Sequence, residues 1–144
     1  MELDIIINYT EKDNESEQGK NGWVTDFARF LTIMLTQVLG KKPNIEIKSE
    51  TSALTVEELQ NTGVLISILS PHFINSGQSL DAIEEFYKIA GNSSTNRLFK
   101  VLKTDVPYED QPAKLKDALP YELFDIDYDS GSAIIFDDYF GPAA

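Results

Sequence analysis

Residues 63–90 read GVLISILSPHFINSGQSLDAIEEFYKIA, and this stretch decides the fold of the chain. Its apolar beginning, residues 64–69, is rich in β-branched side chains and predicts a strand that is buried on both faces. Ser70-Pro71 then predicts a turn, and the apolar residues of about 79–90 recur at the spacing of an amphipathic helix. A polar loop therefore follows the carboxyl end of a buried strand, where open α/β sheets place their ligand sites.

Outward from this stretch, strand patterns alternate with helix patterns along the chain. Strands are predicted at 3–9, 43–48, 64–69, 98–102 and 122–126. One helix is predicted from Trp23 to Val38, with Gly40 as its stop. A second begins at a Thr55–Glu58 capping box and ends before Gly63. A third is predicted at about 79–90, and one or two helical turns within 113–119. The polar segments 10–21 and 91–96 are expected to be loops, and 107–112 a turn region. This alternation predicts an α/β fold, namely a flavodoxin-like, doubly wound, five-stranded parallel sheet with helices on both faces.

The length of the chain suits one domain. With 144 residues we expect a single domain over 1–144, with a core of about 3–126. The remaining extension, 127–144, contains the apolar run Ile134-Ile135-Phe136. We expect this extension to pack back on the domain or to lead into a further sensor domain.

Charge and composition disfavour several classes of function. The chain has 12 Lys and Arg against 24 Asp and Glu, a formal net charge of −12, which disfavours binding to nucleic acid. It has no cysteine, and His72 is its single histidine, so no metal site is expected. No apolar run approaches the ~20 residues that span a bilayer, and the first residues lack the pattern of a signal peptide. We therefore expect a cytoplasmic protein without a membrane contact.

The motifs of several common α/β enzymes are missing. The sequence contains no GxGxxG after the first strand, no Walker-type GK[ST] and no GxSxG, which disfavours dehydrogenases, P-loop NTPases and serine hydrolases. A response-regulator receiver needs paired acids after the first strand and an aspartate at the end of the third. Those strands end in Asn8-Tyr9 and Leu69-Ser70, so this interpretation fails as well.

Four segments of the chain share a further pattern. They are Ile5-Ile6-Ile7-Asn8-Tyr9 followed by Asp13, Gly22-Trp23-Val24 with its helix, Ser70-Pro71-His72-Phe73-Ile74-Asn75-Ser76, and Arg97-Leu98-Phe99-Lys100-Val101 through Pro107. In order and spacing they resemble the TIR (Toll/interleukin-1 receptor) domain family, and the third is similar to its Ser-Pro-x-Tyr/Phe-hydrophobic-x-Ser box. The resemblance covers residues 3 to about 126. It implies NAD+ as a substrate, with no other cofactor, and self-association through TIR–TIR contacts.

The decisive difference from the family lies just after this box. Where many members read Ser-x-Trp-Cys-x-x-Glu, this chain reads Ser76-Gly77-Gln78-Ser79-Leu80-Asp81-Ala82. The resemblance thus places the family's catalytic glutamate at Ala82, which has no ionisable group and cannot act as base, nucleophile or charge stabiliser. With Ser79 as the N-cap, Ala82 would be the third helical residue, where a glutamate completes a capping box. Whether Ala82 is an engineered substitution or natural stays open.

The resemblance also implies an NAD+ site at the carboxyl ends of the strands. Its candidate contacts are Asn8, Tyr9 and Thr10 after the first strand, Lys48 near the end of the second, and Ser76 and Ser79 at the start of the helix. Plainer structural roles stay open, since Tyr9 suits core packing, Ser76 suits hydrogen bonds to loop amides, and Lys48 suits the surface. Glu84 and Glu85 replace the missing acid only if the helix register shifts; otherwise they form an exposed acidic face.

Two functions follow from the resemblance. One is an effector that hydrolyses NAD+ to nicotinamide and ADP-ribose, is activated by self-assembly under a C-terminal sensor domain or partner protein, and serves bacterial immune defence. This chain is expected to be inactive in that role because of Ala82. The alternative is a non-enzymatic TIR scaffold that acts by homotypic self-association.

Overall fold

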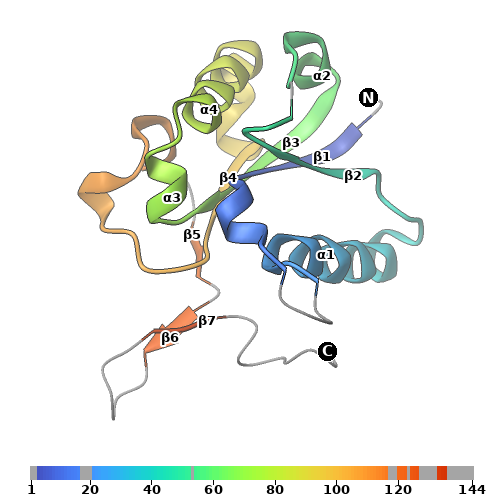
Figure 1. The fold of residues 1–144 in the computed structure, drawn as a ribbon. Coiled ribbons are helices and arrows are strands. Elements are labelled where there is room, and N and C mark those ends of the chain that lie inside the picture. The colour runs from blue at the N-terminus through green and yellow to red at the C-terminus, as the bar shows by residue number, and fades with distance from the viewer. Residues whose placement is uncertain are drawn as a thin grey trace.

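A computed structural model of the chain describes residues 3–16, 21–52, 54–116, 120–122, 124–126 and 133–135. At its centre β1 (Leu3–Tyr9), β2 (Ile45–Ser49), β3 (Thr62–Leu69) and β4 (Leu98–Leu102) form a parallel sheet in the order β2-β1-β3-β4 (Figure 1). The three-residue β5 (Pro120–Glu122) pairs in parallel with the end of β4. The α/β class and the parallel sheet, which the alternation of patterns predicted, are confirmed.

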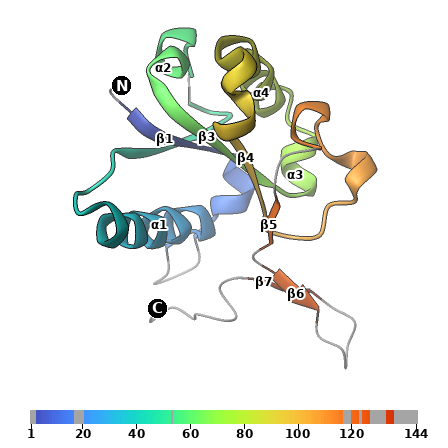
Figure 2. The ribbon, with the colours of Figure 1, turned by 180° about the vertical axis from the view of Figure 1, so that it is seen from behind.

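Helices cover both faces of this sheet (Figure 1 and Figure 2). On one face packs α1 (Trp23–Leu39), and on the other pack α2 (Val56–Gln60), α3 (Pro71–Ile74) and α4 (Gly77–Ala90). The cause is visible in β1, where successive side chains point to opposite faces: Ile5 and Ile7 join the core under α1, and Ile6 joins the core under α4. A strand with consecutive apolar residues, such as Ile5-Ile6-Ile7, requires cover on both sides.

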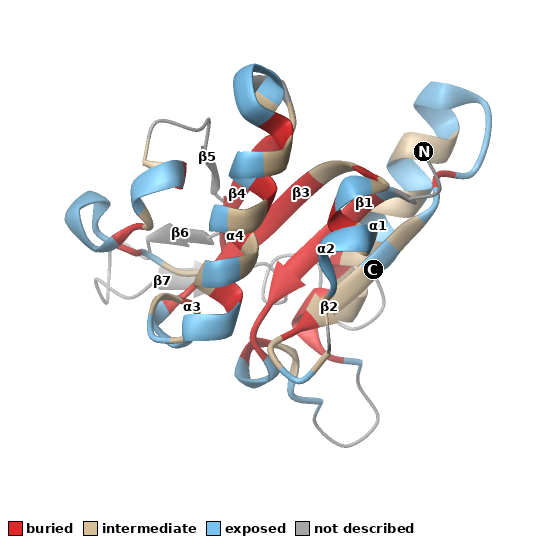
Figure 3. Cartoon of the chain, turned by 90° about the horizontal axis from the view of Figure 1, so that it is seen from above, coloured by how far each residue is buried: buried red, intermediate tan, exposed pale blue. Residues whose placement is uncertain are grey.

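Burial follows this layering. The central strands and the inner stripe of α4 are buried, whereas the outward faces of the helices are exposed (Figure 3). The core on the α1 side contains Ile5, Ile7, Tyr9, Trp23, Val24, Phe27, Ile66, Ile68 and Val101. The core on the α4 side contains Ile6, Leu59, Leu65, Leu69, Phe73, Ile83, Phe86, Ala90, Leu98, Leu102, Val106 and Leu115.

Two helix boundaries confirm the sequence signals. The residue that follows α1 is Gly40, whose φ of 76° is left-handed and whose N–H donates to the carbonyl of Thr36. Before α2, the hydroxyl of Thr55 accepts from the N–H of Glu58, and the carboxylate of Glu58 accepts from the N–H of Thr55. This is the complete capping box that the sequence predicted.

The helix α4 begins earlier than the sequence predicted. The helix starts at Gly77 with Ser76 as its N-cap, and not near residue 79 with Ser79 as the cap. The physical reason is that the hydroxyl of Ser76 reaches the N–H of Ser79 and accepts a hydrogen bond from it. Ser70 caps the preceding α3 in the same way, so a short helix stands where the sequence predicted only a turn.

The predicted loops contain 3-10 turns. The loop predicted over 10–21 includes η1 (Glu11–Asn14), and the loop predicted over 91–96 is η2 (Gly91–Asn96). The region after β4 contains η3 (Tyr108–Asp110) and η4 (Ala113–Leu115), while residues 117–119 of the predicted helical turns lie outside the described residues.

The predicted strand over 122–126 is wrong in its bounds. Glu122 ends β5, whereas β6 (Phe124–Ile126) pairs antiparallel with β7 (Ala133–Ile135). A partner so near in the chain needs only a short loop closure, which favours the local hairpin over extension of the main sheet. Apart from β7, the extension 127–144 lies outside the described residues.

Candidate functional site

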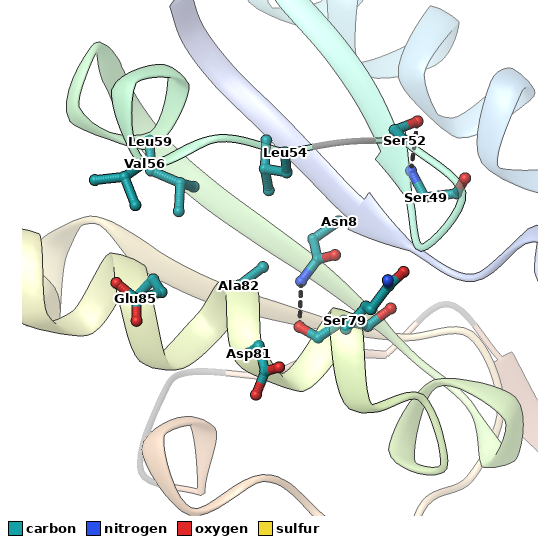
Figure 4. Close-up of a pocket in the computed structure, with 11 residues that line it drawn as sticks. Asn8, Ser49, Ser52, Leu54, Val56, Leu59, Ser79, Asp81, Ala82 and Glu85 are labelled. Carbon is teal, nitrogen blue, oxygen red and sulfur yellow. Dashed lines mark hydrogen bonds between the residues drawn. The ribbon is translucent and has the colours of Figure 1, made fainter.

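A cavity of about 240 Å³ lies between α4 and the segment that leads from β2 to α2 (Figure 4). Its wall consists of Asn8, Ser49, Ser52, Leu54, Val56, Leu59, Gln78, Ser79, Asp81, Ala82 and Glu85. Asn8 and Ser49 stand at the carboxyl ends of the neighbouring parallel strands β1 and β2. Because the strand order reverses at β1, the connections that follow β1 and β3 leave on opposite faces, and this is where open α/β sheets bind ligands.

Asn8 joins the sheet to α4 at one side of the cavity. The residue is 2% exposed, and its Nδ2 donates to the backbone oxygen of Ser79 (3.0 Å) and to Oγ of Ser67 (3.4 Å). Since a carbonyl oxygen only accepts, the nitrogen of the amide must face Ser79 and Oδ1 must turn away from it. Among the described residues Oδ1 has no hydrogen-bond partner. Asn8 therefore fixes the first turn of α4 and keeps one acceptor unused.

Serine hydroxyls hold that first turn. Oγ of Ser76 accepts from the N–H of Ser79 and donates to Oγ of Ser79 at 3.0 Å. Both serines that the sequence proposed as NAD+ contacts thus have structural partners. Ser79 also lines the cavity, whereas Ser76 is not part of its wall.

Ala82 lines the cavity from the second turn of α4. Counted from Gly77 it is the sixth residue of the helix, so it cannot be the third helical residue that a cap at Ser79 implied. Its methyl group points toward the segment that carries Leu54 (Figure 4). A longer side chain at this position would enter the cavity rather than complete a capping box.

Opposite α4 the wall has an apolar part, Leu54, Val56 and Leu59, beside the polar Ser49 and Ser52. Lys48, one of the candidate NAD+ contacts, is outside this wall. Its Nζ pairs with the carboxylates of Glu58 (3.2 Å) and Glu46 (3.5 Å), and the hydrogen bond to Glu58 is the main cause that raises the pKa of Lys48. The ammonium group is therefore already engaged by acids of its own chain.

Tyr9 and Thr10 are buried and do not line the cavity. Tyr9 belongs to the core under α1, where burial chiefly raises its pKa and the carboxylates of Glu11 and Glu50 raise it further. The hydroxyl of Thr10 donates to Asp13 at 2.6 Å. Of the predicted residues, the structure thus brings Asn8, Ser79 and Ala82 together around one cavity.

Sequence reasoning missed a buried polar cluster at the ends of three strands. Asp13 in η1 is 3% exposed and accepts from Thr10 and from the hydroxyl of Ser70, the cap of α3. Lys103, the residue after β4, donates to the same carboxylate. An acid shortly after the first strand was visible in the TIR pattern, but nothing in the local sequence marks Lys103 as its partner.

The cavity has a negative character. The charged residues of its wall are Asp81 and Glu85, and no Lys or Arg occurs among the wall residues that the structure describes. Lys88 approaches Glu85 at 3.5 Å, but its side chain is 70% exposed and the pair is a weak surface contact. The wall therefore suits a ligand that donates hydrogen bonds and carries no negative charge inside the cavity.

Compared with protein-family models and with curated proteins, the chain matches neither a family nor a curated relative. In the part of the chain that the structure describes, no helix has the length and apolar character needed to cross a membrane. The same part contains no group of three or more His, Cys, Asp or Glu residues arranged to hold a metal ion.

Proposed function

We propose that the chain is a TIR-like domain whose cavity binds NAD+, and that it assembles with copies of itself but does not cleave NAD+ while residue 82 is alanine. The observation that carries this proposal is the place of Ala82 in the cavity wall, beside Asn8 and Ser79. The TIR pattern aligns the family's catalytic glutamate with this position. A glutamate side chain here would extend into the cavity.

The chemistry explains why one residue decides between binding and turnover. Hydrolysis of NAD+ breaks the bond between ribose C1′ and the pyridinium nitrogen, so positive charge develops on the ribose while nicotinamide leaves as a neutral molecule. A carboxylate beside the ribose stabilises this developing charge. The methyl group of Ala82 cannot do so.

The proposal also includes the detailed sheet topology of the domain and its role in the cell. The order β2-β1-β3-β4-β5 and the helices on both faces support a flavodoxin-like, doubly wound, five-stranded sheet. In this proposal the domain is cytoplasmic and belongs to an effector of bacterial immune defence. A C-terminal sensor domain or a partner protein would then drive its assembly.

The test is the substitution Ala82→Glu in the full chain, fused to an oligomerising domain so that assembly does not limit the reaction. Release of nicotinamide from NAD+ is measured by chromatography. We expect release by Ala82→Glu and none by the parent chain or by Ala82→Gln, which matches glutamate in size without its charge. An assembled Ala82→Glu protein that binds NAD+ and leaves it intact would refute the hydrolase assignment, and one that fails to bind NAD+ would refute the site as well.

A scaffold without enzymatic activity is the second candidate, because α1 carries an apolar outer surface. Ile33, Met34, Val38 and Leu39 are exposed by 45% to 77%. Sedimentation velocity with and without NAD+ separates the two candidates. A scaffold assembles with increasing concentration whether or not NAD+ is present, and Val38→Glu abolishes that assembly.

A further inference from the structure

We infer that the cavity selects its ligand through a hydrogen-bond donor presented to Oδ1 of Asn8, and that in NAD+ this donor is the carboxamide N–H of the nicotinamide. The inference rests on the proposed NAD+ site. It adds a specificity-determining residue to that site.

The Asn8 side chain is held in one orientation. It is almost fully buried, its Nδ2 is engaged by Ser79 and Ser67, and its Oδ1 has no partner among the described residues. A flip of the amide would place two oxygens against each other at Ser79, so the orientation is fixed by chemistry. Oδ1 is not among the fully buried side-chain atoms that lack a partner, so it keeps accessible surface, and Asn8 is part of the cavity wall. A ligand that fills the cavity displaces water from this acceptor, and it binds well only if it brings a donor in exchange.

The charges of the cavity wall disfavour an anionic group. Asp81 and Glu85 are both acceptors, and no cation of the described wall is available for the pyrophosphate of a dinucleotide. Lys48 is occupied by Glu58 and Glu46. The pyrophosphate is therefore unfavourable inside the cavity, whereas the pyridinium ring is positively charged and compatible with both carboxylates.

The shape of the cavity suits a flat ring. The apolar side of the cavity, formed by Leu54, Val56 and Leu59, suits the face of a flat ring, and the opposite side carries the polar groups of α4. A nicotinamide riboside combines a flat ring, a positive charge and a carboxamide with two N–H donors. The adenosine half of the dinucleotide offers no such charge, and it would lie outside the cavity.

The test compares three ligands that differ only at the carboxamide. They are nicotinamide riboside, 3-acetylpyridine riboside, in which a methyl group replaces the NH2, and nicotinic acid riboside, in which a carboxylate replaces the amide. Calorimetry on the unmodified chain measures each affinity. We expect the amide to bind about tenfold or more tightly than either analogue, because each analogue leaves Oδ1 without a donor.

Equal affinity for the amide and the methyl ketone overturns this inference and leaves the NAD+ site standing. Absence of binding by all three ribosides and by NAD+ overturns both. Binding of NAD+ without any riboside overturns the assignment of the nicotinamide end to the cavity, again without touching the proposed function.

Substitutions of single residues test whether Asn8 causes the preference for the amide ligand. In Asn8→Ala the preference of the amide over the methyl ketone should fall to about one, whereas Ser67→Ala, which removes only a partner of Nδ2, should keep it. Glu85→Gln should weaken the discrimination against nicotinic acid riboside and leave the discrimination against the methyl ketone unchanged. If Asn8→Ala keeps the preference, Oδ1 is not the acceptor. If that variant does not fold, the ligand series on the unmodified chain still decides.

Discussion

Nζ of Lys103 lies 3.3 Å from Oδ1 of Asp13, although 90 residues separate the two in the chain. The Asp13 side chain is 3% exposed and that of Lys103 is 16% exposed, so water screens this pair little. Hydroxyl groups of Thr10 and Ser70 donate to the other carboxylate oxygen. The loop after β1 is thus bound to the ends of β3 and β4 in the interior.

Asp13→Asn should lower the free energy of unfolding by about 3 kcal/mol, because it leaves the ammonium group of Lys103 buried without a counter-charge. Urea denaturation measures the change. The control is Lys12→Ala, which breaks the Lys12–Glu15 pair, 67% exposed on both sides, and should change stability by less than about 0.5 kcal/mol. Similar effects of the two variants would contradict a buried ion pair.

Ser76→Ala should cost about 1 kcal/mol of stability, since Ser76 is the N-cap of α4. Ser76→Asp should retain most of the stability, because aspartate also accepts at the cap and its charge suits the helix N-terminus. Ser79→Ala should cost less than Ser76→Ala, because residue 79 lies inside the helix, where alanine is favoured. Thermal and urea unfolding of the three variants measure these differences, and the reverse order would restore Ser79 as the cap.

Glu58 should make the domain less stable in acid. Burial raises the pKa of Glu58, but hydrogen bonds from Thr55 and Lys48 lower it more, so the pKa lies below the ordinary value of 4.5. The folded state therefore favours the carboxylate. This stabilisation is complete above the unfolded pKa and is lost as the pH falls through the folded one.

Glu58→Gln provides the measurement of that effect. At pH 7 we expect the parent chain to be more stable than Glu58→Gln by about 0.5 to 1 kcal/mol, since both partners of the Lys48–Glu58 pair are partly exposed. Below the folded pKa the difference should vanish. A difference that stays constant between neutral and acidic urea titrations would show that the charge of Glu58 contributes nothing.

Gly22→Ala should destabilise the beginning of α1. A Cβ at residue 22 would overlap the backbone oxygen and Oδ1 of Asn14, and that Oδ1 accepts from the N–H of Thr25. We expect a loss of about 1 to 3 kcal/mol in urea unfolding. The control is Gly77→Ala, where a Cβ meets no atom within 4 Å and the change should be neutral or slightly stabilising. Equal effects would show that Asn14 moves away at no cost.

The sequence predicted best where one local pattern is sufficient. The apolar runs of β1 and β3 and the periodicity of α1 with its Gly40 stop reflect interactions within a few residues, and the structure confirms them. The predicted start of α4 is wrong because Ser76 and Ser79 are the same residue type and have the same preference for the N-cap position. Only the position of the Ser76 hydroxyl in the folded chain distinguishes them.

The candidate site was predictable in part for the same reason. The TIR resemblance implied a site at the carboxyl ends of the strands with Asn8 among its contacts, and Asn8 lines a cavity at that edge of the sheet. The engagement of Lys48 by Glu58 depends on where α2 packs, and the contact of Asp13 with Lys103 depends on the whole sheet order. Tertiary structure fixes such contacts, and no local pattern encodes them.

The small size of α2 has a consequence for the cavity. A helix of five residues does not persist by itself in water, so α2 depends on the Thr55–Glu58 cap, the Lys48–Glu58 pair and the burial of Leu59. Amide hydrogen exchange should therefore reveal α2 as a unit that opens locally, at lower free energy than the central strands. Leu59 and Val56 line the cavity, so acid strong enough to protonate Glu58, whose pKa lies below 4.5, should loosen the pocket before it opens the central strands.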